Sequence, residues 1–172
     1  MGRCWRSSGA WIPVAPRTST RARRIAGFTL LEMMIVVAIL ATLAAMAIPS
    51  YRAAVLTARY EMGMREMNLL QNEIDVYEMK FGALPLTLAE LDHGAMLDPW
   101  GNPYQYLNFT TIVGKGVGAK RKDRFLVPLN STYDLSSMGP DGQSKPTLTA
   151  AASRDDIIRA NDGDYIGLAA DY

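Results

Sequence analysis

The chain has 172 residues, 49% of them apolar, and its 18 basic and 17 acidic side chains leave a formal net charge of +1. This length fits one small domain with an appendage rather than a multidomain enzyme. Residues 1–27 contain six arginines and no acid, so residues 28–172 carry 12 basic and 17 acidic groups, a net charge of −5. That acidic remainder argues against nucleic-acid binding as the main role.

Cysteine and histidine are each present once, as Cys4 and His93. One cysteine cannot form an intramolecular disulfide, and a lone Cys4 in the arginine-rich start argues against a cysteine nucleophile or a cysteine-ligated zinc. His93 lies between Asp92 and Gly94 in a turn-like stretch with no recognisable nucleophile motif beside it, which favours a solvated loop histidine over a catalytic base. The sequence therefore predicts a protein that is not an enzyme.

Residues 28–48 read FTLLEMMIVVAILATLAAMAI, and Glu32 is their only charged residue. A helix of this segment would be about 31 Å long, enough to cross a hydrocarbon core of roughly 30 Å. Because arginines crowd its N-terminal side, the positive-inside rule places that end in the cytoplasm. We expect a single-pass inner-membrane protein whose C-terminal part faces the periplasm or the cell exterior.

One interpretation of this segment is an ordinary signal peptide, cut after residues 45–47 (AMA), so that the mature chain would begin at Ile48. The protein would then be secreted, and a metal-dependent hydrolase is the corresponding function. Against this, the apolar stretch is longer than the usual h-region of roughly 7 to 15 residues and contains an acid. A carboxylate in such a segment is costly without a partner, which makes Glu32 a candidate functional residue.

The other interpretation starts from residues 27–32, which read GFTLLE after the arginines and before the apolar run. This motif resembles the class III signal of type IV pilins and pseudopilins. The resemblance implies that prepilin peptidase cuts between Gly27 and Phe28 and methylates the new amine of Phe28. When many such helices pack side by side, that amine and Glu32 are both buried, so pairing between neighbouring copies compensates both charges and sets the axial register. Alternatively, Glu32 only sits near the lipid headgroups.

Beyond Pro49, apolar residues recur at spacings of mostly 3 and 4 as far as about Met79. This pattern predicts that an amphipathic helix over 49–80 continues the apolar helix of 28–48, with a local kink at Pro49 and a C-cap at Gly82. Residues 1–27 would be a cleaved basic leader, and residues 81–172 a globular head.

Within the head, residues 104–109, 124–127 and 132–136 read as short strands, while residues 120–124 (KRKDR) read as a solvated tip. Strands packed on a long helix predict an α+β fold with a small antiparallel sheet. Residues 98–104 read DPWGNPY, and this stretch resembles the major pseudopilins of type II secretion systems, the general secretion pathway protein G family. The resemblance implies a type IV pilin-like fold.

Two acidic stretches follow, residues 137–142 (SMGPDG) and 153–157 (SRDDI). Their spacing is not that of an EF-hand, and acidic turns are commonly just solvated. The pair resembles the turn of the pseudopilins that binds a structural calcium ion. The resemblance implies side-chain ligands and two helper carbonyls, namely Asp141, Asp155 and Asp156 with the carbonyls of Met138 and Ser153. The intervening segment 143–154 is longer than is usual in that family.

The resemblance extends over residues 27–157 and implies a non-enzymatic filament subunit. Its partners would be further copies of itself, minor pseudopilins, prepilin peptidase, the membrane before assembly, and an inner-membrane assembly platform with its ATPase. The product would be a periplasmic pseudopilus that drives protein export across the outer membrane. A type IV pilin or competence pilin, whose filament reaches the cell surface, is the alternative within the class. The secreted hydrolase is the alternative outside it.

Overall fold

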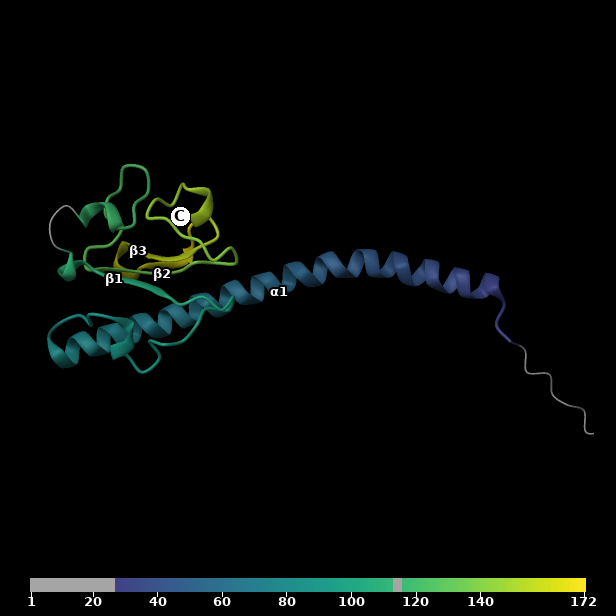
Figure 1. Ribbon diagram of the computed structural model, residues 1–172, viewed down its shortest axis with the longest axis horizontal. Helices are drawn as coiled ribbons and strands as arrows, with labels where there is room; N and C mark the ends of the chain where they lie inside the picture. The colour runs from purple at the N-terminus through teal and green to yellow at the C-terminus, as the bar shows by residue number, and fades with distance from the viewer. Residues whose placement is uncertain (1–26, 113–115) are drawn as a thin grey trace, which may run out of the picture. The chain divides into compact units, whose positions relative to one another are not determined.

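The structure is a computed structural model that describes residues 27–112 and 116–172. The predicted leader, apart from Gly27, lies outside the described residues. The α-helix α1 spans Leu30–Phe81 and continues through Pro49 (Figure 1). Gly82 follows the last helical residue as the cap. Its φ is +72°, and its N–H donates to the Glu78 carbonyl over 2.8 Å. Glycine reaches this left-handed conformation without a steric penalty, so the predicted cap is confirmed.

Four short strands form an antiparallel sheet in the order β1-β2-β3-β4. Their bounds are Gln105–Asn108 (β1), Tyr133–Ser137 (β2), Ile157–Ala160 (β3) and Tyr165–Leu168 (β4). The register pairs Tyr106 with Leu135, Ser137 with Ile157, and Ile157 with Leu168. Figure 1 shows the sheet lying along the C-terminal part of α1. This is the α+β, type IV pilin-like fold that the sequence predicts.

The sheet buries side chains on both faces. Met67, Leu70 and Ile74 of α1 pack with a first group of sheet residues that includes Leu135 and Ile157. A second cluster consists of Leu129, Leu148, Ile158, Ala160 and Ala169. Because neighbouring strand residues point to opposite faces, Ile157 and Ile158 enter different clusters. The loops of the head therefore cover the face of the sheet that α1 leaves open.

The strand predictions are partly right. Strands at 104–109 and 132–136 are confirmed, with β1 and β2 inside or within one residue of those ranges. A strand at 124–127 is wrong: Asp123 and Leu126 exchange backbone hydrogen bonds of 3.1 and 2.6 Å across a tight turn. Phe125 stands fully exposed at its tip. Strands β3 and β4 are absent from the sequence prediction, which assigns residues 153–157 to an acidic stretch.

Candidate functional site

The residues of the predicted processing motif lie at the start of α1. Gly27 and Phe28 precede the helix, and the Phe28 side chain is 78% exposed. The Thr29 hydroxyl accepts the Glu32 backbone N–H over 3.2 Å, which places Glu32 in the first turn. An acid there complements the positive end of the helix dipole. Glu32 itself is exposed and forms no ion pair with the described residues.

The apolar segment that follows has no partner within the described part of the chain. Every residue of 28–48 is exposed, including Leu31 at 68% and Met46 at 77%. Such a continuous apolar surface needs a membrane or neighbouring helices to cover it. Over the residues that the structure describes, α1 is the helix long and apolar enough to cross a membrane, judged by length and composition.

The two acidic stretches meet at the end of the sheet, and we call residues 138–142 and 153–156 the acidic loop. Gly139 and Gly142 both have positive φ values, +60° and +65°. A Cβ on Gly139 would lie 2.3 Å from the Asp155 carbonyl oxygen, so only glycine permits this approach. The Asp141 N–H donates to Asp155 Oδ2 over 3.3 Å. The structure thus brings Asp141 and Asp155 together, as the sequence predicts.

Residues 98–104, the DPWGNPY stretch, form hydrogen bonds that hold this loop. The Asp98 carboxylate accepts the Asn102 N–H over 2.8 Å and the Ser137 hydroxyl over 2.6 Å. The Asn102 side-chain amide in turn donates to the Gly139 carbonyl over 3.1 Å. Residues 98–104, which carried the second resemblance, therefore hold the first half of the acidic loop in place.

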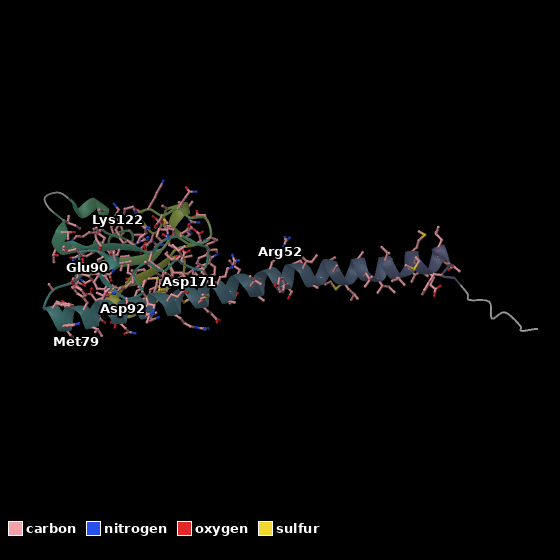
Figure 2. All side chains as sticks on the ribbon, turned by 60° about the horizontal axis from the view of Figure 1, so that its bottom comes forward. Arg52, Met79, Glu90, Asp92, Lys122 and Asp171 are labelled. Carbon is pink, nitrogen blue, oxygen red and sulfur yellow. The ribbon has the colours of Figure 1, made fainter. Side chains whose placement is uncertain are left out.

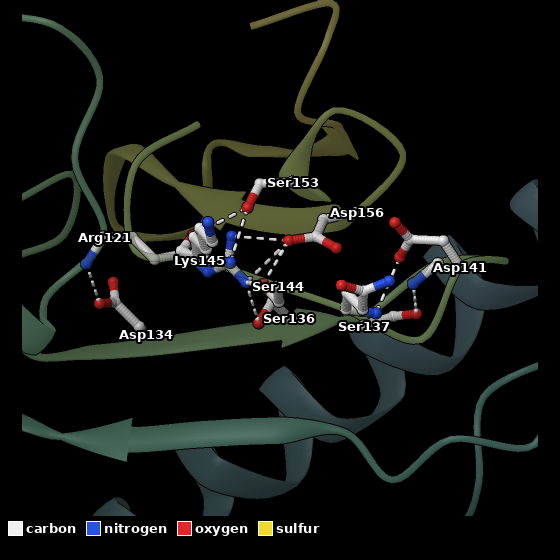
Figure 3. Close-up of polar contacts among 11 residues, drawn as sticks. Arg121, Asp134, Ser136, Ser137, Asp141, Ser144, Lys145, Ser153 and Asp156 are labelled. Carbon is white, nitrogen blue, oxygen red and sulfur yellow. Dashed lines mark hydrogen bonds and ion pairs between the residues drawn. The ribbon is translucent and has the colours of Figure 1, made fainter. Parts of the chain in front are cut away.

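Asp156 immediately precedes β3 and is completely buried. Its Oδ2 accepts both terminal nitrogens of Arg121, each over 3.1 Å, and the Ser144 hydroxyl over 2.5 Å (Figure 3). Burial raises the pKa of Asp156, against the hydrogen bond from Ser144 and the charge of Arg121, which lower it. Its other oxygen, Oδ1, is buried and has no hydrogen-bond partner among the described residues.

The three predicted carboxylates act electrostatically on Tyr60 of α1. Burial is the largest cause that raises the pKa of Tyr60, and the negative charges of Asp155, Asp141 and Asp156 raise this pKa further. The Tyr60 ring also packs edge-on against Trp100, with ring centroids 4.9 Å apart. Tyr60 thus lies within electrostatic reach of the acidic loop and in contact with Trp100.

The two predicted helper residues occupy different settings. Met138 follows β2 directly and is half-buried. Ser153 is buried; its carbonyl accepts the Asp156 N–H over 3.4 Å, and its hydroxyl accepts the Lys145 N–H over 2.7 Å. The Ser153 hydroxyl thus joins the two ends of the long segment 143–154, to which Ser153 itself belongs.

The donor set fits a hard cation, because every predicted ligand offers oxygen and Asp156 Oδ1 is an orphaned buried acceptor. The site is not closed by side chains alone: within residues 27–112 and 116–172, no group of three or more His, Cys, Asp or Glu side chains is gathered tightly enough to hold a metal ion. A cation there would need backbone carbonyls and water to complete its coordination.

Sequence reasoning missed Arg121. Interpreted as part of a solvated tip, it is instead 6% exposed. Its backbone N–H donates to Asp134 Oδ2 over 2.7 Å, and its guanidinium donates to the Ser136 hydroxyl over 2.8 Å. The available signal was in β2, where Asp134 and Ser136 alternate on one face of a strand and require a buried donor.

His93 joins its loop to α1 through contacts with Glu73. Its backbone N–H donates to Glu73 Oε2 over 3.1 Å, and its ring Nδ1 contacts the other oxygen of the same carboxylate. The imidazole is 58% exposed. The expected loop histidine is therefore tied to the helix by Glu73.

Comparisons with known proteins agree with the two motifs. A family model described as the prokaryotic N-terminal methylation motif matches residues 22–48. The type II secretion system core protein G of Aeromonas hydrophila is 32% identical over 107 residues, which cover 50% of this chain and 75% of the relative. The corresponding proteins of Pseudomonas aeruginosa and Vibrio cholerae are each 29% identical, covering 70% and 76% of this chain and 87% and 91% of the relatives.

No solved structure gives a significant match. The methylation motif covers the GFTLLE stretch and the start of α1, and the matches to the Pseudomonas and Vibrio relatives cover 70% and 76% of this chain, well beyond the length of α1. Together with the long helix on a small antiparallel sheet, they show that the chain belongs to the type II secretion system core protein G family.

Proposed function

We propose that the chain is the structural subunit of the pseudopilus of a type II secretion system. The observation that carries this proposal is the contrast along α1. Residues 28–48 are all exposed and almost entirely apolar, whereas Met67, Leu70 and Ile74 are completely buried under the sheet. A folded head that carries an uncovered apolar helix is suited to two environments in turn, the bilayer and a bundle of identical helices.

Processing comes first in this proposal. Prepilin peptidase cuts between Gly27 and Phe28 and methylates the Phe28 amine, while the arginines of residues 1–27 hold the N-terminus in the cytoplasm. The head is then periplasmic. Gly27 suits the cut because it has no side chain to obstruct a close approach of the peptidase to the backbone.

Assembly follows by extraction of the apolar helix from the membrane. The Phe28 amine and Glu32 of neighbouring copies pair once both are buried, which neutralises two charges that would otherwise be costly. An assembly platform with its cytoplasmic ATPase adds subunits at the base, minor pseudopilins join the filament, and its growth moves exported proteins through the outer membrane. The chain acts through polymerisation and not as an enzyme.

The acidic loop is proposed to bind a structural calcium ion. Asp156 Oδ1, Asp141 and Asp155 would supply carboxylate oxygens, and Met138 and Ser153 would supply carbonyls. The orphaned, fully buried Oδ1 of Asp156 and the hydrogen bond from the Asp141 N–H to the Asp155 carboxylate support this assignment. A divalent cation would neutralise that charge.

The N-terminal residue and intact mass of the protein, recovered from membranes of cells that contain prepilin peptidase, test the proposed function. A chain that starts at methylated Phe28 is expected. A chain that starts at Ile48 would mean ordinary secretion and would remove Glu32 from the mature protein. Cells that lack the peptidase are the control, and in them the chain should keep its leader.

The thermal midpoint of the processed protein in calcium and in EGTA tests the calcium site. Trp100 reports on it, because it is the one tryptophan of residues 28–172 and packs on Tyr60. Calcium at about 100 times its dissociation constant is expected to stabilise the fold by about 2.7 kcal/mol. Asp155→Ala should abolish that rise, and Asp164→Ala, an exposed acid outside the acidic loop, should retain it. An unchanged rise in Asp155→Ala would remove calcium from this site.

A further inference from the structure

Arg121 is a buried cation beside the acidic loop. Its side chain is 7% exposed, and its two terminal nitrogens each lie 3.1 Å from Asp156 Oδ2. One of them also donates to the hydroxyls of Ser136 over 2.8 Å and Ser144 over 2.5 Å. Figure 3 shows the guanidinium between Ser136, Ser144 and Asp156, on the side of Asp156 away from Asp141. The charge pair is thus buried, and its hydrogen bonds are made through Asp156 Oδ2.

The backbone beside Arg121 is hydrogen-bonded to residues 146–148, which lie between the two halves of the acidic loop. The Lys122 N–H donates to the Pro146 carbonyl over 2.9 Å, and the Leu148 N–H donates to the Lys122 carbonyl over 3.0 Å. These bonds form a parallel bridge between Lys122 and Thr147. Figure 2 shows Lys122 on the side of the head opposite α1. These backbone hydrogen bonds hold Lys122, the neighbour of Arg121, beside the long segment 143–154.

We propose that Arg121 serves the acidic loop as a cation built into the chain. It neutralises Asp156 through Oδ2, so that the head keeps its fold without a metal ion, and it leaves Asp156 Oδ1 free to bind a metal ion. An ionised carboxylate that is fully buried is very costly unless it is paired and hydrogen-bonded. Arg121 supplies that pairing from within the chain. A divalent cation would then act mainly on the remaining charge of Asp141 and Asp155.

This inference rests on the proposed function only in treating the acidic loop as a cation site. The pairing of Arg121 with Asp156 predicts stability in the absence of metal, whereas the calcium proposal predicts a change when metal is added. The two can therefore fail separately. A measurement in EGTA addresses Arg121 alone, and the same measurement in calcium addresses the metal.

The experiment uses the processed full-length protein in detergent, with Trp100 fluorescence giving the thermal midpoint in EGTA and in calcium chloride. Arg121→Met keeps the length of the side chain but removes its charge. We expect its midpoint in EGTA to fall by about 10 °C, and calcium to raise this variant's midpoint more than that of the unmodified chain. Arg124→Met is the matched control, because Arg124 is exposed three residues away. It should behave as the unmodified chain does.

Arg121→Met combined with Asp156→Asn separates charge from packing. If the unpaired anion causes the loss, removing both charges should recover at least half of the fall in EGTA, even where Arg121→Met alone does not fold. An EGTA midpoint of Arg121→Met equal to that of Arg124→Met would overturn the proposal. So would failure of the double variant to recover, because Arg121 would then act by filling space. A midpoint that calcium leaves unchanged in every variant, with the fall in EGTA present, supports Arg121 and removes the calcium site.

Discussion

Gly63 of α1 lies directly against Ile157 of β3. A Cβ built on Gly63 would be 2.5 Å from Ile157 Cδ1, and Ile157 is completely buried. Met67, Leu70 and Ile74 continue the same face of the helix toward its C-terminus and are also completely buried. The missing side chain at residue 63 therefore lets the helix and the sheet approach closely where this face begins.

Gly63→Leu is expected to destabilise the head strongly. A branched side chain cannot enter the contact with Ile157 without moving the sheet, and overpacking of this kind costs about 1 to 3 kcal/mol or more. Gly63→Ala is the graded comparison: alanine gains about 1 kcal/mol of helix propensity, which offsets part of its smaller clash. Thermal unfolding followed by Trp100 fluorescence checks both. A Gly63→Leu midpoint equal to that of the unmodified protein would contradict this contact.

Arg159 of β3 joins the sheet to α1 by a polar contact. The side chain is 4% exposed, and its Nε donates to Gln71 Oε1 over 2.9 Å. The guanidinium lies 4.0 Å from the centroid of the Tyr133 ring, and Nη1 donates to the Tyr133 carbonyl over 3.2 Å. Burial, partly offset by the Arg159 charge, raises the pKa of Tyr133 to about 12.

Gln71→Leu should therefore lower the stability of the head by about 1 to 3 kcal/mol, because it leaves the buried Nε of Arg159 without an acceptor. Gln71→Glu keeps an acceptor at the same place and should retain most of the stability. The urea midpoint of the processed protein measures both changes. Equal midpoints for the leucine and glutamate variants would show that the hydrogen bond to Gln71 contributes nothing.

The parts of the fold that were predictable are those with a long local pattern. Helix α1 is predicted by a continuous apolar run over residues 28–48, by apolar spacings of 3 and 4 beyond Pro49 and by a glycine cap, and such signals need no knowledge of the rest of the chain. Strands β3 and β4 have four residues each, too few for an alternating pattern to stand out. Because β3 is buried on both faces, its IIRA sequence shows no apolar–polar alternation either.

The same argument applies to the acidic loop. Asp141, Asp155 and Asp156 could be grouped from the sequence because a family resemblance joined them. Arg121 could not, because its partner Asp156 is 35 residues away and its own neighbours are charged. A run of basic residues usually indicates a solvated surface. Only the tertiary packing of two loops shows that one arginine of the run faces inward.

Asp162 provides a pH-dependent contribution to stability. Its carboxylate accepts the Ser131 N–H over 2.7 Å and lies 3.9 Å from Arg159 Nη1. Burial acts to raise the pKa of Asp162, but the hydrogen bonds from Ser131 and the charge of Arg159 together outweigh it and lower the pKa. An acid whose pKa is lower in the folded state stabilises the fold at pH values above its pKa in the unfolded state, which is about 3.9. This contribution is lost as the pH falls through the pKa of the folded state.

Asp162→Asn should therefore reduce stability at pH 7 and make no difference in strong acid. Asparagine also tolerates the positive φ of +56° at this position, so the change isolates the charge. Because the carboxylate is 50% exposed, the loss should be less than about 1 kcal/mol. Urea midpoints between pH 7 and pH 2.5 measure it, with Asp164→Asn on the same turn as the control. A difference that stays constant over this range would assign the effect to shape instead of charge.

Glu32→Ala tests the assembly step without disturbing the head. The variant keeps the apolar helix and the Gly27–Phe28 bond, so processing to methylated Phe28 should remain intact by mass. Packing of the helices would, however, bury the Phe28 amine without its carboxylate, and an uncompensated buried charge costs about 3 to 5 kcal/mol. We expect the yield of filaments sheared from the cells to fall by more than about tenfold.

Glu61→Ala is the matched control, because Glu61 lies on the same helix, is exposed and pairs only with Arg65 among the described residues. Filaments of normal yield from processed Glu32→Ala would show that register is set without this pair. Loss of filaments in both variants would show that any acid of α1 matters, and that the first turn has no special role.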